Sequence, residues 1–418
     1  MEIALNSRAR KMGVLGATFL LASVFLTAST MHSVADYLSQ AGKNLNLAAR
    51  LEPDNAQIAE LMGRQLLRQH HADVHAALRQ YRLAASLNPH NSAYWLAIAD
   101  AEQILNDAPG QRYALERAIA TDPTTPAVAW SAANFLLAQS DKGAALRQFK
   151  VVVENDPGKA DRIFALSSHV ADVPEMIENL LPPSPNAYLS LLNFLTGQRN
   201  TSGAAQVWNA LAHLGQPFEP RGALAYVDYL LSQHEVAAAR LAWRQAAEPC
   251  GLSAYLPSTE NLIVNANFDS AILNGGFDWH YHHQANVEIT LDPAELHGGH
   301  RSLSLVFDGP GVDDTGIAQQ IAVQPSTAYE FSAYYKAAAM DGAGGARLVI
   351  QDAYTGIQYF SSDDLRNADV WHAVNGAFKS GMDTQLVVLH VVRLPAGSPI
   401  RGKLWIGDLR LSEKQRDF

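Results

Sequence analysis

The chain has 418 residues, 48% of them hydrophobic and 17% charged, and a formal net charge of −10 at pH 7. A chain of this length is longer than a single hydrophobic core usually holds together, so more than one domain is expected. The negative net charge argues against a protein that binds nucleic acid. The single cysteine, Cys250, excludes an intrachain disulfide framework and is predicted to be an inert side chain.

The N-terminal segment combines a basic cluster with a long apolar run. Residues 8–11 carry three basic side chains, residues 12–31 are mostly apolar, and the next charged residue is Asp36. Such a run spans a hydrocarbon layer of about 30 Å, and basic residues ahead of it keep the N-terminus cytoplasmic. We therefore predict that residues 1–33 hold a cytoplasmic tail and a single-pass anchor in the inner (cytoplasmic) membrane, with the bulk of the chain periplasmic or otherwise extracytoplasmic.

A cleaved signal peptide is the alternative to a retained anchor. The stretch Ser33-Val34-Ala35 places small residues just before Asp36, where a signal peptidase could cut. The apolar run is longer than the usual core of about 7–15 residues in such a peptide, which favours the anchor. Both alternatives export the chain.

Residues 34–248 contain an internal repeat of 34 to 36 residues. Its clearest marker is a proline, which stands at Pro53, Pro89, Pro123 and Pro157. Apolar residues recur three and four positions apart on both sides of each proline, as on the face of a helix, so each repeat is predicted to be a pair of helices. After a proline-rich break, two further units continue the pattern to about residue 248.

This pattern resembles the tetratricopeptide repeat, which has a period of about 34 residues. Small residues at the contact between helices, Trp95 early in a first helix and the closing prolines carry the resemblance. It implies an α-solenoid whose extended concave side binds a protein partner. Four aromatic residues could line that groove but are expected mainly in the interhelical core. They are Tyr94, Trp95, Tyr113 and Trp130.

Residues 258–413 change from a helical to an alternating pattern. Short apolar stretches separated by Gly, Asp and Asn predict the strands of an antiparallel β-domain. A segment of this length with about eight strands suits a two-sheet sandwich of the jelly-roll type. The predicted fold class is therefore multidomain α + β, with a transmembrane helix, an α-solenoid and a C-terminal sandwich.

The order of motifs in this last segment resembles that of carbohydrate-binding modules of the family 4 and 9 type. The chain has NANFD at 265–269, Trp279 after a Gly-rich turn, and LWIGDLRL at 404–411. The resemblance implies that aromatic rings stack on sugars while polar side chains hold the hydroxyl groups. The side chains expected to do so are Tyr281, Tyr335, Gln351, Asp352, Tyr354 and Tyr359. The alternative is a sandwich whose tyrosines only close its core.

In that family the two ends of the domain commonly meet around a structural calcium ion. Carried over by position, Asp269 and Asp408 would supply carboxylate oxygens, which are ligands that calcium prefers. The chain departs from the family pattern, because Asp269 replaces a glutamate and Gly407 replaces the first of two acids. Two carboxylates held by ordinary hydrogen bonds are the alternative.

The stretch NGGFDWHYHH at 274–283 gathers three aromatic residues and three histidines. A zinc site needs about three or four ligands, and an extended strand would project at most His280 and His282 to one face. We therefore expect an opening hairpin of the sandwich, with Phe277 and Trp279 packed in its core.

Motifs of catalysis are missing from the sequence, which has no G-x-S-x-G, H-E-x-x-H, Walker loop or paired-cysteine motif. The predicted function is non-enzymatic: a membrane-anchored scaffold that binds protein partners through its repeats and glycan through its sandwich, in the assembly or export of envelope polysaccharide. One alternative is a purely structural interaction protein. Another is a polysaccharide-active hydrolase that uses the paired carboxylates at 313–314 or 363–364.

Overall fold

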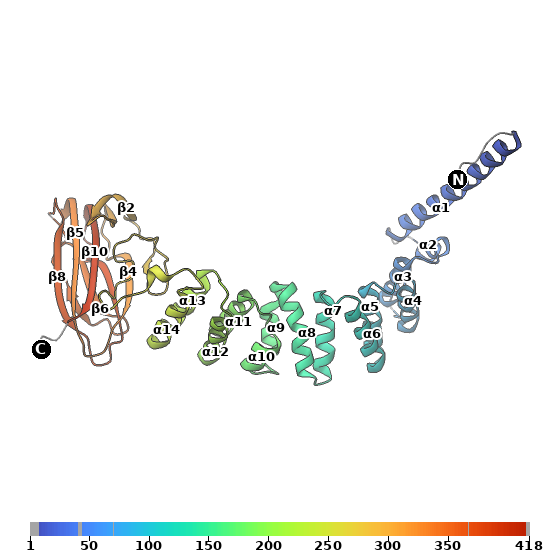
Figure 1. Ribbon diagram of the computed structural model, residues 1–418, viewed down its shortest axis with the longest axis horizontal. Helices are drawn as coiled ribbons and strands as arrows, with labels where there is room; N and C mark the ends of the chain where they lie inside the picture. Colours follow the sequence, from blue (N-terminus) through green and yellow to red (C-terminus); the bar gives the residue numbers. More distant parts are fainter. Residues whose placement is uncertain (1–7, 41–43, 70, 367, 415–418) are drawn as a thin grey trace. The chain divides into compact units, whose positions relative to one another are not determined.

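The computed structural model describes residues 8–40, 44–69, 71–366 and 368–414 (Figure 1). Their contacts divide the chain into two compact units, Met1–Pro182 and Pro183–Phe418. The described part of the first unit is helical, whereas the second unit contains further helices followed by two antiparallel sheets. The predicted fold class, a helical array followed by a β-sandwich, is therefore confirmed.

The first unit is built from consecutive helical hairpins. Its α-helices are α1 (Arg8–Gln40), α2 (Leu45–Leu51), α3 (Ala56–Arg68), α4 (Val74–Leu87), α5 (Ser92–Ile104), α6 (Ala108–Thr121), α7 (Pro126–Ala138), α8 (Lys142–Asn155), α9 (Ala160–Ser167) and α10 (Val173–Asn179). The most extensive helix contacts join α3 to α4, α5 to α6 and α7 to α8. These are the pairs that the spacing of the prolines predicts.

Aspartates spaced 34 residues apart begin the second helix of three successive pairs. The side chains of Asp73, Asp107 and Asp141 each accept a hydrogen bond from the backbone N–H three residues ahead. A cap of this kind stabilises a helix by about 0.5–2 kcal/mol. The period is thus present in the turns as well as in the buried positions.

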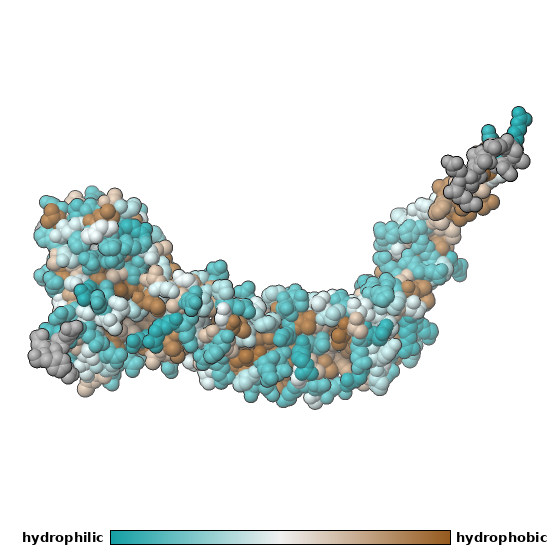
Figure 2. Space-filling model, viewed as in Figure 1, coloured by the Kyte–Doolittle hydropathy of each residue, from teal (hydrophilic) through white to brown (hydrophobic). Residues whose placement is uncertain are grey.

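Helix α1 contains the apolar N-terminal segment and also packs in the first helical pair. Its part Lys11–Gln40 is long and apolar enough to cross a membrane, and Figure 2 shows apolar side chains on the surface of this helix. Near the end of α1, Ala35 is fully buried and packs with Ala48 of α2 and Ile58 of α3. The helix therefore continues without a break from the apolar segment into the packed array.

Four helices open the second unit. They are α11 (Pro185–Gly197), α12 (Thr201–His213), α13 (Pro220–Ser232) and α14 (Val236–Ala246). Trp208 and Trp243, at equivalent positions of α12 and α14, are 3% and 2% exposed. Trp208 stacks on Tyr226 of α13 with ring centroids 4.9 Å apart. Large side chains also fill the equivalent positions of the first unit, where Tyr81 and Phe149 are buried.

The sandwich has two five-stranded antiparallel sheets. The first, here the β4 sheet, has the order β1-β4-β9-β6-β7, and the second, the β5 sheet, has the order β2-β3-β10-β5-β8. The strands are β1 (Trp279–Tyr281), β2 (Val287–His297), β3 (His300–Gly309), β4 (Asp314–Ala322), β5 (Ala328–Gly342), β6 (Gly345–Asp352), β7 (Gln358–Ser361), β8 (His372–Lys379), β9 (Leu386–Leu394) and β10 (Ile400–Glu413). This arrangement confirms the predicted two-sheet sandwich.

Alternate residues of the strands point between the sheets and form the core. Phe331 of β5, Leu389 of β9 and Leu404 of β10 are each at most 2% exposed. Phe268 and Trp279 lie in the same cluster, with ring centroids 5.2 Å apart. Trp279 thus lies in the core as expected, but the expected opening hairpin is wrong, because β1 pairs with β4 and β2 belongs to the other sheet. Phe277 packs against Trp243 of α14 and not in this cluster.

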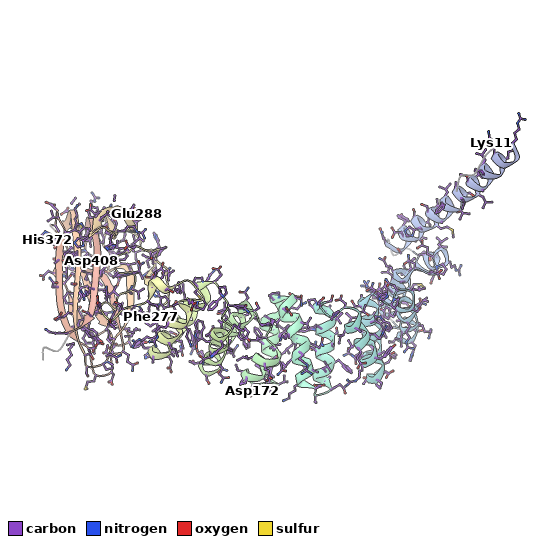
Figure 3. The ribbon with its side chains drawn as sticks, viewed as in Figure 1. Lys11, Asp172, Phe277, Glu288, His372 and Asp408 are labelled. Carbon is purple, nitrogen blue, oxygen red and sulfur yellow. The ribbon has the colours of Figure 1, made fainter. Side chains whose placement is uncertain are left out.

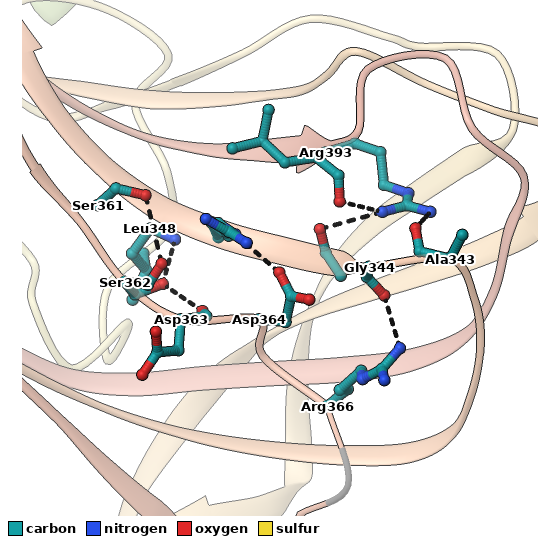
Figure 4. A network of polar contacts seen from close by, with 12 residues as sticks. Ala343, Gly344, Leu348, Ser361, Ser362, Asp363, Asp364, Arg366 and Arg393 are labelled. Carbon is teal, nitrogen blue, oxygen red and sulfur yellow. Dashed lines mark hydrogen bonds and ion pairs between the residues drawn. The ribbon is translucent and has the colours of Figure 1, made fainter.

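A buried arginine ties together the loops at one end of the sandwich (Figure 4). The guanidinium of Arg393 is fully buried and donates to the carbonyl oxygens of Ala343, Gly345 and Pro399. Burial lowers the pKa of this group. Because these carbonyl groups come from two separate loops, one side chain fixes both of them.

Candidate functional site

The outward face of the β5 sheet carries a polar groove of about 590 Å³. On β5, Phe331 and Ala333 face the core, so Ser332 and Tyr334 point outward. Ser332 pairs with Asn375 of the edge strand β8. The residues lining the groove are Glu330, Phe331, Ser332, Asn375, Gly376, Ala377, Arg410 and Ser412. Hydroxyl, amide, carboxylate and guanidinium groups thus converge on one surface.

Three neighbouring rings, two of them stacked and the third tilted, lie beside this groove. The imidazole of His297 stacks on Tyr334 with ring centroids 4.0 Å apart and lies 5.1 Å from the ring of Trp371. Tyr334 is two residues beyond Ser332 on β5, and Trp371 directly precedes β8, whose first residue His372 is marked in Figure 3. The indole N–H of Trp371 is buried without a hydrogen-bond partner among the described residues. These three side chains therefore combine aromatic rings with an indole N–H that donates no hydrogen bond to the described residues.

A second aromatic residue on this face is covered by charged side chains. Trp405 of β10 is 9% exposed, and the amines of Lys403 and Lys336 lie 4.6 and 5.8 Å from its ring centroid. Its indole donates to Asp292 at 2.9 Å. Hydrogen bonds from Trp405, the Ala294 backbone and Lys403 hold the pKa of Asp292 well below its ordinary value. The ring of Trp405 is thus fixed and largely enclosed.

Most of the sugar-binding residues predicted from the sequence lie on the other sheet. Asp352 ends β6, and its carboxylate accepts hydrogen bonds from the backbone of Tyr354 and from the hydroxyl of Thr384. The hydroxyl of Tyr359 lies 2.6 Å from that of Thr384. Burial raises the pKa of Asp352, but these hydrogen bonds outweigh it and the net pKa is lowered. Gln351 precedes Asp352 on β6 and is partly buried. These four residues are therefore brought together around one turn.

The ring of Tyr354 contacts the helical array. Its hydroxyl donates to the carbonyl of Leu231 at 2.8 Å, and its ring stacks on His234 with centroids 3.8 Å apart. His234 has a φ of 63° in the turn between α13 and α14. One face of this tyrosine is therefore occupied by protein.

The remaining two predicted residues lie elsewhere. Tyr281 of β1 is 45% exposed and lines a pocket of about 280 Å³ with its neighbours His282 and His283. Tyr335 of β5 is partly buried against the core of the sandwich, with its ring 6.0 Å from that of His372. The structure thus does not bring the six predicted side chains into one site.

The two aspartates predicted to hold calcium each face a histidine. Asp269 lies 2.6 Å from Nδ1 of His300, and Asp408 lies 3.4 Å from Nδ1 of His297. The described residues hold no cluster of three or more His, Cys, Asp or Glu side chains that could bind a metal ion. Calcium needs about six or more oxygen ligands, whereas Asp269 is hydrogen-bonded to His300 and Asp408 faces an Nδ1 atom of His297 that has no hydrogen-bond partner among the described residues. We therefore derive no role for calcium.

The predicted inert cysteine lies between the array and the sandwich. Cys250 is partly buried, and burial together with Glu219 raises the pKa of its thiol to about 11. A thiol with so high a pKa carries almost no nucleophilic thiolate at neutral pH.

The helical array has a groove of its own, with a volume of about 280 Å³. Asp100 and Gln103 of α5, and Trp130, Asn134 and Gln139 at α7, line it. Burial raises the pKa of the Asp100 carboxyl group. The groove therefore offers amide groups, an aromatic ring and a carboxyl group to a ligand.

The four aromatic residues expected mainly in the interhelical core differ in exposure. Tyr94 is buried, at 8% exposed, whereas Tyr113 is 59% exposed. Trp95 is partly buried, lies edge-on to Tyr113 and donates to the carbonyl of Pro89. Trp130 lines the groove, with the guanidinium of Arg162 5.0 Å from its ring centroid.

The ring cluster of His297, Tyr334 and Trp371 was missed in the sequence, because its members are far apart along the chain. Only Trp371, in the dipeptide Val-Trp, has a recognisable place in the motif order. Pairing of β5 with β8 brings Tyr334 near Trp371, and the irregular end of β2, beyond Asp292, brings His297 to both rings.

Comparison with known proteins gives one family match. Residues 260–393 match the family model described as "Carbohydrate binding domain". No curated protein matches the chain. Among solved structures, one described as "CBM4 structure and function" is 17% identical, with 36% of this chain and 99% of that chain covered and a TM-score of 0.28.

Two further solved structures are matched by other parts of the chain. PilF of Pseudomonas aeruginosa is 16% identical, with 46% of this chain and 90% of that chain covered and a TM-score of 0.26. The MamA protein is 11% identical, with 45% of this chain and 91% of that chain covered and a TM-score of 0.28.

Proposed function

We propose that this chain, an α-solenoid of tetratricopeptide-like repeats followed by a carbohydrate-binding-module-like sandwich, is a membrane-anchored binding scaffold outside the cytoplasm. The sandwich binds glycan and the repeats bind a protein partner. We assign residues 1–33 to the tail and anchor, 34–248 to the array and 258–413 to the sandwich. The division into compact units falls elsewhere, at Pro182, because the last helices contact the sandwich.

The observation that carries the glycan proposal is the outward face of the β5 sheet. There a groove with polar walls adjoins the rings of His297, Tyr334 and Trp371. A pyranose ring presents C–H groups on its face and hydroxyl groups at its edge, so it suits aromatic faces beside hydrogen-bonding side chains. The match of residues 260–393 to a carbohydrate binding domain supports the same function.

The tyrosines predicted from the sequence form a second proposed glycan surface. Tyr359, with Gln351 and Asp352, lies at the β6–β7 turn, and Tyr281 lies on β1. We favour the β5 sheet because it carries a groove lined by polar side chains, whereas Tyr354 at the turn both donates to the carbonyl of Leu231 and packs on His234.

A glycan array tests this function on the full chain in lipid nanodiscs. We expect binding to oligosaccharides with extended pyranose chains, and competition by the same soluble oligosaccharide. A chain that binds no glycan would favour the purely structural alternative. Products released from a polysaccharide by the purified chain would instead support a hydrolase. Against the hydrolase alternative, one carboxylate of each pair already has a protein partner. Asp314 lies 2.7 Å from His390, and Asp364 lies 2.7 Å from Arg347.

Burial of Ala35 supports a retained anchor. Cleavage before Asp36 would remove Ala35 from its contacts with Ala48 and Ile58. We therefore expect a C-terminally tagged chain to stay in the membrane fraction at full length. A soluble product that begins at Asp36 would contradict this proposal.

The protein-binding part of the proposal rests on the groove between α5 and α7. Amide side chains such as Gln103 and Asn134 can pair with the backbone of an extended peptide, while Trp130 contacts its side chains. Together, an anchor, a peptide groove and a glycan-binding face suggest a role in organising envelope polysaccharide assembly or export. Crosslinking in cells, followed by purification of the tagged chain, should then recover polysaccharide-assembly proteins. If the wild-type chain and an Asn134→Ala, Trp130→Ala variant recover the same proteins, the groove is not the binding site.

A further inference from the structure

A cavity of about 420 Å³ lies between helix α14 and the sandwich. Its walls come from α14, from the segment that links the helices to the sandwich, and from β4. Figure 3 marks Phe277, one of its lining residues, between the last helices and the strands. All of these elements belong to the second compact unit. Pockets for small molecules are often found at such junctions and have volumes of about 300–1,000 Å³.

The floor of the cavity is apolar and fixed in place. The indole of Trp243 donates to the carbonyl of Tyr255 at 2.9 Å, and the ring of Phe277 lies edge-on to it at 6.0 Å. Gly276 packs so closely that a Cβ atom there would lie 2.3 Å from the Trp243 ring. Leu262, Val264 and Ile321 extend the apolar wall. The apolar surface is therefore preformed.

The rim of the cavity is cationic. Arg240 and Arg244 are four residues apart on α14, so both lie on the helix face that carries Trp243. Both are exposed, and neither guanidinium has an acidic partner at ion-pair distance among the described residues. Glu413 is the one acidic residue in the lining, so the rim keeps a net positive charge.

A further polar atom in the lining lacks a partner. Oε1 of the Gln320 side chain on β4 is buried and accepts no hydrogen bond from the described residues. A buried acceptor without a donor is costly, so this atom can accept a hydrogen bond from a water molecule held in the cavity.

We propose that this cavity binds an anionic amphiphile, a carboxylate or phosphate group on an apolar chain. The anionic group lies between Arg240 and Arg244, and the chain lies on the floor formed by Trp243 and Phe277. Paired guanidinium groups bind carboxylate and phosphate oxygens through charge-assisted hydrogen bonds, while the apolar chain leaves water. The bound molecule contacts both α14 and the sandwich, and it therefore strengthens their association.

Photolabelling tests this site on the full chain in phosphatidylcholine nanodiscs. Three diazirine-bearing probes share one chain and differ only in the head group: dodecanoic acid, dodecyl phosphate and dodecanol. We expect at least one anionic probe to label peptides within residues 240–264 about tenfold more than the alcohol does. The stronger of the two anionic probes identifies the head group.

Variants at the rim separate this site from general adsorption to protein or lipid. Arg240→Gln with Arg244→Gln should lower anionic labelling of residues 240–264 about tenfold, whereas Arg221→Gln, an exposed position of α13, should leave it unchanged. Thermal unfolding checks that the double variant is folded. Equal labelling by the alcohol, or anionic labelling that persists in the folded double variant, would overturn the proposal.

Discussion

The two sheets of the sandwich have different neighbours. In the described residues, the hydrogen bonds and ring contacts with α13 and α14 come from elements of the β4 sheet: the segment ahead of β1 and the β6–β7 turn. The outward face of the β5 sheet instead carries a groove and stacked rings. One side of the domain thus holds it against α13 and α14, and the other side is the one on which we propose glycan binding. A tyrosine ring has different neighbours on each side, since Tyr354 packs on His234 of the helices and Tyr334 packs on His297 of the sandwich.

The largest effect is expected at the junction with the helices. Gly276 has a φ of 64°, and a Cβ atom there would clash with Trp243. Gly276→Ala should therefore lower the free energy of unfolding of the second unit by about 2–5 kcal/mol, from backbone strain and overpacking together. Urea unfolding measures this value.

Gly215 is the matched control for that substitution. It has a φ of 60°, but a Cβ atom added there would have no other atom within 4 Å, so Gly215→Ala should cost only about 1 kcal/mol. Equal losses at the two glycines would show that close packing against Trp243 contributes nothing.

A buried carboxyl group makes the same junction sensitive to pH. Asp278 is fully buried, and burial raises its pKa to about 6. Because the folded pKa lies above the ordinary value of 3.8, its contribution to stability is fully present below about pH 4 and is lost as the pH rises to about 6. The loss amounts to about 3 kcal/mol.

Asp278→Asn isolates this contribution from the other titrating groups. Urea unfolding between about pH 4.5 and about pH 7.5 covers the raised pKa of Asp278. As the pH rises through this range, the variant should become more stable relative to the wild-type chain. A difference that stays constant with pH would contradict the raised pKa of Asp278.

On the ligand side, Trp371→Ala should weaken glycan binding by about 1–3 kcal/mol, which is about fivefold to 150-fold. The reason is loss of the ring that contacts His297 and adjoins Tyr334. Titration calorimetry with the strongest array ligand measures the change. Tyr281→Ala, an exposed ring on the other sheet, should leave the affinity unchanged, and a loss there would move the site to β1.

The smallest effect is expected at Tyr354. Tyr354→Phe removes the hydrogen bond to the carbonyl of Leu231 and should cost about 0.5–1.5 kcal/mol of unfolding free energy. Glycan affinity should not change, because the ring still packs on His234. Weaker glycan binding in this variant would support the proposed surface at the β6–β7 turn.

The helical array was predictable because its information is local. The spacing of Pro53, Pro89 and Pro123 gave the period, and the pattern of small and large residues gave the helix faces. The aspartate caps at Asp73 and Asp107 repeat at the same distance and would have strengthened the prediction. In such a solenoid each repeat packs on its neighbours in the sequence, so a short stretch of sequence contains most of the residues that determine its packing.

The candidate site was much less predictable because it depends on distant contacts. The exposure of Tyr354 is limited by His234, and the ring cluster at Trp371 requires a histidine from β2 and a tyrosine from β5. Pairing of β5 with β8 places Tyr334 near Trp371, but β2 is separated from β5 by β3 and β10, and His297 reaches the other rings from the irregular end of β2. No spacing in the sequence encodes this arrangement. The sequence therefore shows which residues are aromatic, whereas only the fold shows on which sheet each ring lies.

Hydrogen exchange of the full chain with and without its strongest array glycan tests the central claim most directly. The account predicts slower exchange of backbone amides in β5, in β8 and around Trp371 when the glycan is bound. It predicts no change at the β6–β7 turn, which contacts the helices. Protection confined to that turn, with none in β5 and β8, would contradict a glycan site on the β5 sheet.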